Sequence, residues 1–218
     1  MKIGILGSGD VGQAIGHGFI ELGNEVMIGS RDPKSEKLMT WLSKHGSRAH
    51  TGLFQEAVKF GELLVLATKW EGSATENALT LASLAGKENL NGKIVIDVTN
   101  PLDFSKKTPT LSMGFMDSAG EEVQRWLPDS KVVKAFNAIG SAHMFKPKFE
   151  EGKPDMFICG NDDEAKKKVS EILKNFGWFA IDLGDITISR FLEPLAMIWI
   201  TYGMKTNSWN HAFKLLKK

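Results

Sequence analysis

The sequence predicts an α/β fold with a doubly wound, mostly parallel sheet, followed by a small C-terminal helical segment. Short apolar runs alternate with stretches of helical periodicity from residue 2 to residue 182, which is the βαβ pattern of a parallel sheet. From about Ile186 onward only the helical pattern remains. The chain has 218 residues, of which 42% are hydrophobic, and this is enough for one such domain. We therefore expect a sheet domain over residues 1–184 and a helical segment over residues 185–218.

The first half of the chain predicts four strands, each followed by a helix. Gly23 marks the end of the first helix, since glycine is favoured just after a helix C-terminus. The run Leu63-Leu64-Val65-Leu66-Ala67 is apolar throughout, as expected for a strand that is buried on both faces. The predicted strands are 2–6, 25–28, 48–51 and 63–67, and the predicted helices are 11–22, 33–44, 53–60 and 72–84.

The second half of the chain continues the alternation after a break. Residues 100–114 contain Gly, Ser and Pro and predict a loop. The acidic residues Asp162, Asp163 and Glu164 stand where a helix begins, because carboxylates there cap free N–H groups and complement the helix dipole. The predicted strands are 93–98, 131–136, 156–159 and 178–182, and the predicted helices are 121–127 and 162–176.

The C-terminal segment carries apolar residues in two groups, the first around Phe191 and Leu195 and the second around Trp209 and Phe213. We expect helices in both. Because so short a segment cannot form a core of its own, these residues are expected to pack on the sheet domain or on a second subunit. We therefore expect a homodimer.

The first predicted strand leads directly into a glycine-rich motif, Gly7-Ser8-Gly9-Asp10-Val11-Gly12. In a strand–turn–helix unit the first glycine permits the tight turn, the second lets the backbone approach a pyrophosphate, and the third allows close packing of helix on strand. The phosphates then meet the free N–H groups of the helix N-terminus. The position of this motif predicts a Rossmann-type dinucleotide-binding domain.

The end of the second predicted strand indicates which dinucleotide is bound. Many such folds carry an acid there that bonds a ribose 2′-hydroxyl, whereas this chain has Ser30 and Arg31. A guanidinium offers a forked cationic donor to a 2′-phosphate, so NADP(H) is favoured over NAD. Alternatively, Arg31 pairs at the surface with Asp32 or Glu36. Lys34 either adds charge to the same pocket or lies on the helix surface.

Ligands of open α/β sheets lie across the carboxyl ends of the strands, so the residues that follow each strand are further candidates. We expect the nicotinamide half of the cofactor among eight of them: Thr68, Lys69, Trp70, Thr99, Asn100, Asn137, Ala138 and Ile139. Trp70 is alternatively an anchor at the start of a helix. Lys69 is a weak candidate for a proton donor and is otherwise solvated or phosphate-binding.

The composition excludes several partner classes. The formal net charge of +1 gives no reason to expect nucleic acid or an anionic membrane. The first strand begins at Lys2, and no apolar stretch is long enough to span a bilayer, so we expect a cytoplasmic protein without a signal peptide. The single cysteine, Cys159, is expected to fill the core in a reducing compartment. The five histidines show no metal-binding spacing, so no metal site is expected.

The motifs together resemble one family, the NADP oxidoreductases that use the deazaflavin coenzyme F420, with their bacterial dinucleotide-binding relatives. The resemblance covers the full length. It includes the glycine motif, Gly29-Ser30-Arg31 and Trp70, and its most specific elements are Cys159-Gly160-Asn161-Asp162-Asp163-Glu164-Ala165-Lys166-Lys167, Asp182-Leu183-Gly184, and Ser189-Arg190 with Glu193. It implies hydride transfer between nicotinamide and a stacked flavin-like ring, with the protein chiefly aligning the rings.

The segment Asn137-Ala138-Ile139-Gly140 differs from the histidine and proline-containing loop of that family, which leaves the acceptor open. The second substrate is then coenzyme F420, a flavin, or another small acceptor such as a quinone, imine or carbonyl. Pyrroline-carboxylate reductases and hydroxy-acid dehydrogenases resemble this chain through the same N-terminal motif. They usually build their substrate sites with a long helical C-terminal domain, and the presence of only about thirty residues after Gly184 argues against them. A non-enzymatic NADP(H)-sensing module is a further alternative.

Overall fold

The fold is taken from a computed structural model, which describes residues 1–70 and 86–218. The helix predicted over residues 72–84 lies outside the described residues. The described chain forms one large sheet in the order β10-β9-β8-β5-β4-β1-β2-β3. Its strands are β1 (Lys2–Leu6), β2 (Glu25–Gly29), β3 (Ala49–Gly52), β4 (Leu63–Leu66), β5 (Ile94–Asp97), β8 (Lys131–Lys134), β9 (Asp155–Gly160) and β10 (Phe179–Asp182).

The sheet is mostly parallel, as predicted. The six strands from β3 to β8 run in one direction, while β9 pairs antiparallel with β8, matching Val133 with Gly160, and β10 runs parallel to β9. A parallel neighbour needs a crossover connection, usually a helix. The connection from β8 to β9 holds only a short 3-10 turn at Ser141–His143, so the chain returns antiparallel.

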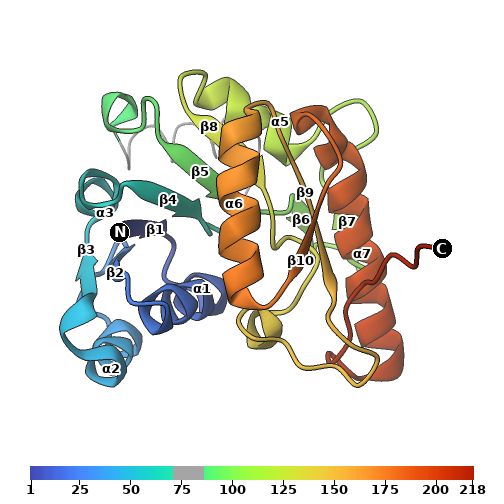
Figure 1. The fold of residues 1–218 in the computed structure, drawn as a ribbon, viewed down its shortest axis with the longest axis horizontal. Coiled ribbons are helices and arrows are strands. Elements are labelled where there is room, and N and C mark those ends of the chain that lie inside the picture. The colour runs from blue at the N-terminus through green and yellow to red at the C-terminus, as the bar shows by residue number, and fades with distance from the viewer. Residues whose placement is uncertain (71–85) are drawn as a thin grey trace.

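Helices cover both faces of this sheet (Figure 1). They are α1 (Asp10–Glu21), α2 (Glu36–His45), α3 (Phe54–Phe60), α5 (Ala119–Trp126), α6 (Asp163–Phe176) and α7 (Ser189–Thr206), with 3-10 turns at Gly46–Arg48, Lys87–Asn89, Ser141–His143 and Ile186–Ile188. No helix in the described part of the chain is long and apolar enough to cross a membrane.

Alternate strand residues build two separate cores. Ile3 and Ile5 of β1 point into one core with side chains of α1, α2 and α6. Leu64 and Leu66 of β4 point into the other with side chains of α3 and α5. This follows from the two-residue period of a strand and explains why the strands read as continuous apolar runs. The doubly wound, Rossmann-type architecture is thus as the sequence predicts.

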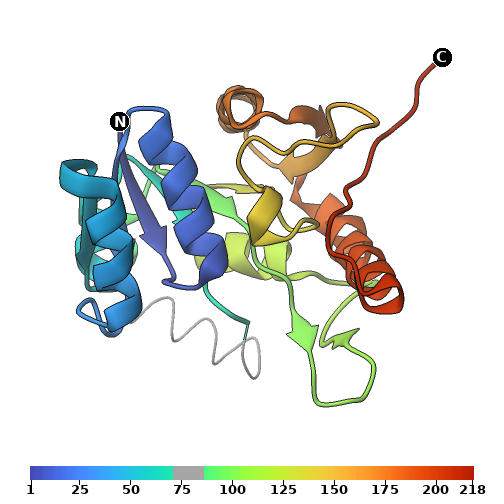
Figure 2. The ribbon, with the colours of Figure 1, turned by 90° about the horizontal axis from the view of Figure 1, so that it is seen from below.

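Two segments differ from the sequence prediction. The predicted loop over residues 100–114 contains a small antiparallel pair, β6 (Leu102–Asp103) and β7 (Thr110–Leu111), which Figure 2 shows projecting from the body. The helix predicted around Trp209 and Phe213 is wrong: after Asn207, in a left-handed conformation, the chain runs as a tail without regular structure.

Contacts with the sheet domain explain the extended tail. The Asp155 N–H donates to the Phe213 carbonyl at 3.0 Å, so the tail lies along the start of β9. The Trp199 indole donates to the His211 carbonyl at 2.9 Å, and its ring contacts that of Trp209. Backbone groups that bond to β9 and to a side chain of α7 in this way are not available for a helix.

Candidate functional site

The glycine motif forms the turn from β1 into α1, and its backbone leaves space where a phosphate would bind. Gly7 has a φ of +129°, and a Cβ there would lie 2.3 Å from the Ala67 carbonyl oxygen. A Cβ on Gly12 would lie 2.1 Å from the Gly7 carbonyl oxygen. Gly9 precedes the first turn of α1, and a Cβ there would meet nothing within 4 Å. Open space in front of free helix N–H groups fits a pyrophosphate.

The residues after β2 lie next to this turn. The Ser8 and Ser30 hydroxyl oxygens are 3.3 Å apart, and the Ser30 hydroxyl accepts the Asp32 N–H at 3.2 Å. Ser30 is buried, whereas Arg31 and Lys34 are exposed. Within the described residues the Arg31 side chain has no ion pair, so the alternative pairing with Asp32 or Glu36 is not observed. The exposed Arg31 thus follows directly on Ser30, whose hydroxyl lies beside the glycine turn.

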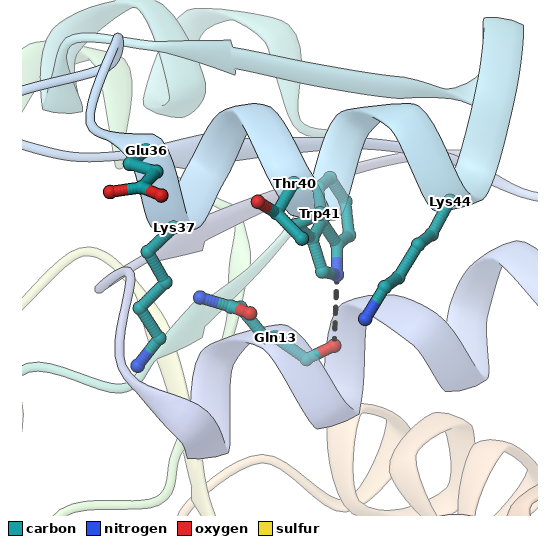
Figure 3. A pocket seen from close by; sticks show the side chains of 6 residues that line it. All are labelled: Gln13, Glu36, Lys37, Thr40, Trp41 and Lys44. Atoms are coloured by element: carbon teal, nitrogen blue, oxygen red, sulfur yellow. Dashed lines mark hydrogen bonds between the residues drawn. The ribbon is translucent and has the colours of Figure 1, made fainter.

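A hollow of about 420 Å³ lies on the flank of this turn, between α1 and α2. Figure 3 shows its lining, in which the Trp41 indole donates to the Gln13 carbonyl at 3.3 Å. At its edge the Lys37 ammonium pairs with the Asp10 carboxylate of the glycine motif at 2.8 Å. The hollow is lined by Gln13, Glu36, Lys37, Thr40, Trp41 and Lys44. Sequence reasoning did not single it out, because it forms only where the facing sides of α1 and α2 meet.

The predicted residues after β4 lie in different surroundings. Thr68 is half-buried and Lys69 is exposed. The ring of Trp70 is buried and stacks on Trp126, with centroids 5.5 Å apart and planes at 17°. This contact is what the alternative role of Trp70 as an anchor would require.

The predicted residues after β5 and β8 meet directly. The Asn100 amide donates to the Asn137 carbonyl at 2.7 Å, and the Asn137 amide donates back to the Asn100 side-chain oxygen at 3.1 Å. The Thr99 hydroxyl points inward and donates to the Asp97 carboxylate at 2.7 Å. Ala138 is half-buried and Ile139 is buried. The two strand ends therefore form one amide-lined unit at the carboxyl edge of the sheet.

A buried ionic cluster beneath this unit was not predicted from the sequence. The Lys134 ammonium lies 2.8 Å from the Asp97 carboxylate and 3.0 Å from the Glu193 carboxylate, and all three side chains are at most 1% exposed. Glu193 also accepts the N–H groups of Ala119 and Gly120 at the start of α5. Burial alone lowers the pKa of Lys134, but the two carboxylates outweigh this and raise it.

A signal for the cluster was present in the sequence but is weak. Lys134 follows two valines in a buried strand, and Glu193 belongs to the Ser-Arg-x-x-Glu element that resembles the family. A lysine at a strand end is ordinarily solvated, so burial could not be inferred without knowing its partners. Among the described residues no group of three or more His, Cys, Asp or Glu side chains is placed to hold a metal ion.

Comparison with known proteins identifies the family. The model of the family described as NADP oxidoreductase, coenzyme F420-dependent, matches residues 2–101. The F420-dependent NADP reductase of Methanocaldococcus jannaschii is 32% identical, and the match covers 95% of each protein. The chain belongs to the coenzyme F420-dependent NADP oxidoreductase family. This confirms the resemblance and the expected enzyme class, an NADP-dependent oxidoreductase.

Two further similar proteins show how much of the fold is shared and how much of a larger protein this chain matches. A crystal structure from Arthrobacter sp. FB24, which carries the provisional name F420-dependent NADP-reductase, is 40% identical with a TM-score of 0.90 and covers all of both chains. Metalloreductase STEAP3 of Rattus norvegicus is 32% identical over 90% of this chain, which spans only 36% of that protein. The fold is thus shared over the full chain, while the metalloreductase has most of its length outside the match.

Proposed function

We propose that this member of the family binds NADP(H) across the carboxyl edge of its sheet and passes hydride between the nicotinamide and a flavin-like or deazaflavin acceptor. One observation carries the proposal. The open glycine turn at Gly9 lies beside buried Ser30 and the adjoining Arg31, whose side chain has no ion pair within the described residues. A phosphate turn beside an available guanidinium suits a dinucleotide with a 2′-phosphate.

Each part of the cofactor has its own set of residues in this proposal. The pyrophosphate lies on the glycine motif, which consists of Gly7, Ser8, Gly9, Asp10, Val11 and Gly12. The free backbone N–H groups at the start of α1 would bind it, whereas the Gly7 N–H donates to the Gly29 carbonyl at 3.2 Å and so holds the turn against β2. The 2′-phosphate is bound by Ser30 and Arg31, with Lys34 adding positive charge. The nicotinamide half lies along Thr68, Lys69, Trp70, Thr99, Asn100, Asn137, Ala138 and Ile139.

The proposed reaction depends mainly on the alignment of the nicotinamide ring with the acceptor ring. A bound nicotinamide would exchange a hydride with a flavin-like ring, and neither ring would need a bond to the protein. The Asn100–Asn137 unit offers amide groups that orient the nicotinamide, and Ile139 closes one side of the space around it. Holding two rings in contact accounts for much of the rate of such a transfer, which is consistent with a site built of amides, hydroxyls and apolar groups.

Coenzyme F420 is the acceptor that we favour, because relatives named F420-dependent NADP reductases match over nearly their full length. An ordinary flavin, or a quinone, imine or carbonyl compound, is the alternative.

We further propose a cytoplasmic homodimer. Phe191, Leu195, Ile198 and Tyr202 are spaced three and four residues apart along α7, and three of them are more than half exposed. Such a stripe suits packing against the same helix of a second copy.

The test follows NADPH absorbance with coenzyme F420, FMN, FAD, riboflavin and a small panel of quinones, imines and carbonyls. The proposal predicts oxidation that depends on F420 or a flavin and that is slow with NADH. Turnover only with the other acceptors would overturn the choice of acceptor but not the enzyme class. Tight binding of NADPH without turnover would instead favour a sensing module. Sedimentation velocity of the same preparation tests the homodimer, with a monomer contradicting it.

A further inference from the structure

Two tiers of contacts join the same three segments of the protein, namely the end of β5, the end of β8 and helix α7. In the upper tier, the Asn137 amide bonds both the Asn100 side chain and the Leu192 carbonyl, the latter at 2.7 Å. In the lower tier, Lys134 bonds both Asp97 and Glu193. Each tier therefore takes one residue from each segment, and the central residue of each comes from the chain around the end of β8.

The lower tier is fully enclosed and its charges are well satisfied. One oxygen of Asp97 accepts the Lys134 ammonium, and the other accepts the N–H and hydroxyl of Thr99. The carboxylate of Glu193, a residue of α7, contacts the N-terminus of α5, where free N–H groups and the helix dipole favour a negative charge. A buried ion pair is weak evidence for stability as such. Its effect here is geometric, because it fixes α7 against the two strand ends.

The backbone between the two tiers adopts an unfavourable left-handed conformation at Phe136. Phe136 has a φ of +60° although its ring is bulky and only 1% exposed. Left-handed backbone is unfavourable for such a residue and persists only where the surroundings enforce it. Phe136 stands between Lys134 of the lower tier and Asn137 of the upper tier, so this backbone sets where the Asn137 amide points.

We propose that α7 is a working part of the nicotinamide half of the site, with Lys134 and Glu193 as positioning residues that act through Asn100 and Asn137. The inference rests on the proposed function, since it presumes that the nicotinamide lies at these strand ends. The adenosine half is held by the glycine motif and Arg31, on the other side of β4 and outside both tiers. Loosening the tiers should therefore weaken only the nicotinamide half.

The experiment compares two ligands by calorimetry: NADPH and adenosine 2′,5′-bisphosphate, which carries the adenosine half with its 2′-phosphate but no nicotinamide. In Glu193→Gln, an amide N–H₂ replaces one oxygen that accepts N–H donors, so the lower tier loses at least one charged contact. We expect the Kd for NADPH to rise about tenfold and that for the bisphosphate to stay within about twofold. Glu171→Gln makes the same change on exposed Glu171 of α6 and should alter neither.

A second variant keeps the test informative if Glu193→Gln does not fold. The triple variant Asp97→Asn, Lys134→Met, Glu193→Gln leaves no unpaired buried charge and should show the same selective loss. Equal weakening of both ligands, or no change in either, would overturn the inference and leave α7 as support for the fold alone. If the wild-type protein bound neither ligand, the proposed function itself would fail, which is a different result.

Discussion

Replacing Arg31 with alanine should separate the two nicotinamide cofactors. The Arg31 side chain is exposed and has no ion pair within the described residues, so its removal breaks no internal contact and should leave the fold unchanged. A charge-assisted contact with a phosphate contributes about 1.5–3 kcal/mol. At about 1.4 kcal/mol per tenfold, Arg31→Ala should raise the Kd for NADPH about 10- to 150-fold. The exposed position favours the lower end of that range.

NADH lacks the 2′-phosphate, so its affinity should change little in the same variant. Both Kd values are measured by calorimetry at two salt concentrations, because screening should weaken NADPH binding to the wild type more than to the variant. Arg48→Ala serves as the matched control, since Arg48 is an exposed arginine in the turn after α2. Equal losses for NADPH and NADH in Arg31→Ala would refute the assignment of the 2′-phosphate to Arg31.

Three further predictions concern single residues. Gly12→Ala should abolish detectable NADPH binding in calorimetry, because its Cβ would lie 2.1 Å from the Gly7 carbonyl oxygen; unchanged affinity would contradict the geometry of the turn. Burial raises the pKa of the Cys159 thiol to about 11, so a thiol reagent at pH 8 should label only the unfolded protein, and rapid labelling of the native protein would contradict this. The Ala165 N–H lowers the pKa of Asp162 below its ordinary 3.8. The stabilising effect of this carboxylate is therefore fully present above pH 3.8 and is lost progressively as the pH falls through the lowered pKa, so Asp162→Ala should lower the urea midpoint more at pH 7 than at pH 2.5; equal losses at the two pH values would contradict this.

The sequence pattern was sufficient to predict those parts of the fold whose conformation depends on neighbouring residues in the chain. The β1–turn–α1 unit was predictable because Gly7 and Gly12 serve the backbone of their own turn. The strands of both halves were predictable within a few residues, since burial on both faces leaves a continuous apolar run. The place of Ser30 and Arg31 beside the glycine turn was predictable as well, because they directly follow β2, which pairs with β1.

Contacts between residues far apart in the chain could not be predicted from the sequence. The Lys134 and Asp97 side chains that meet in the lower tier are 37 residues apart, and nothing near either one indicates the other. The tail after Asn207 has an apolar pattern that suits a helix, but its backbone bonds β9 instead. Tertiary contacts of this kind override local propensity. The left-handed Phe136 is a further example, because a phenylalanine gives no local reason to expect it.

Direct hydride transfer is tested by following deuterium from NADPH that is labelled at the transferring carbon of its nicotinamide ring. With coenzyme F420 as acceptor, we expect the label on the ring carbon of the reduced deazaflavin, because hydride passes directly between the two aligned rings. Deazaflavin reduced with hydrogen from solvent instead, or NADPH that is bound but never consumed by any flavin-like ring, would rule out this transfer.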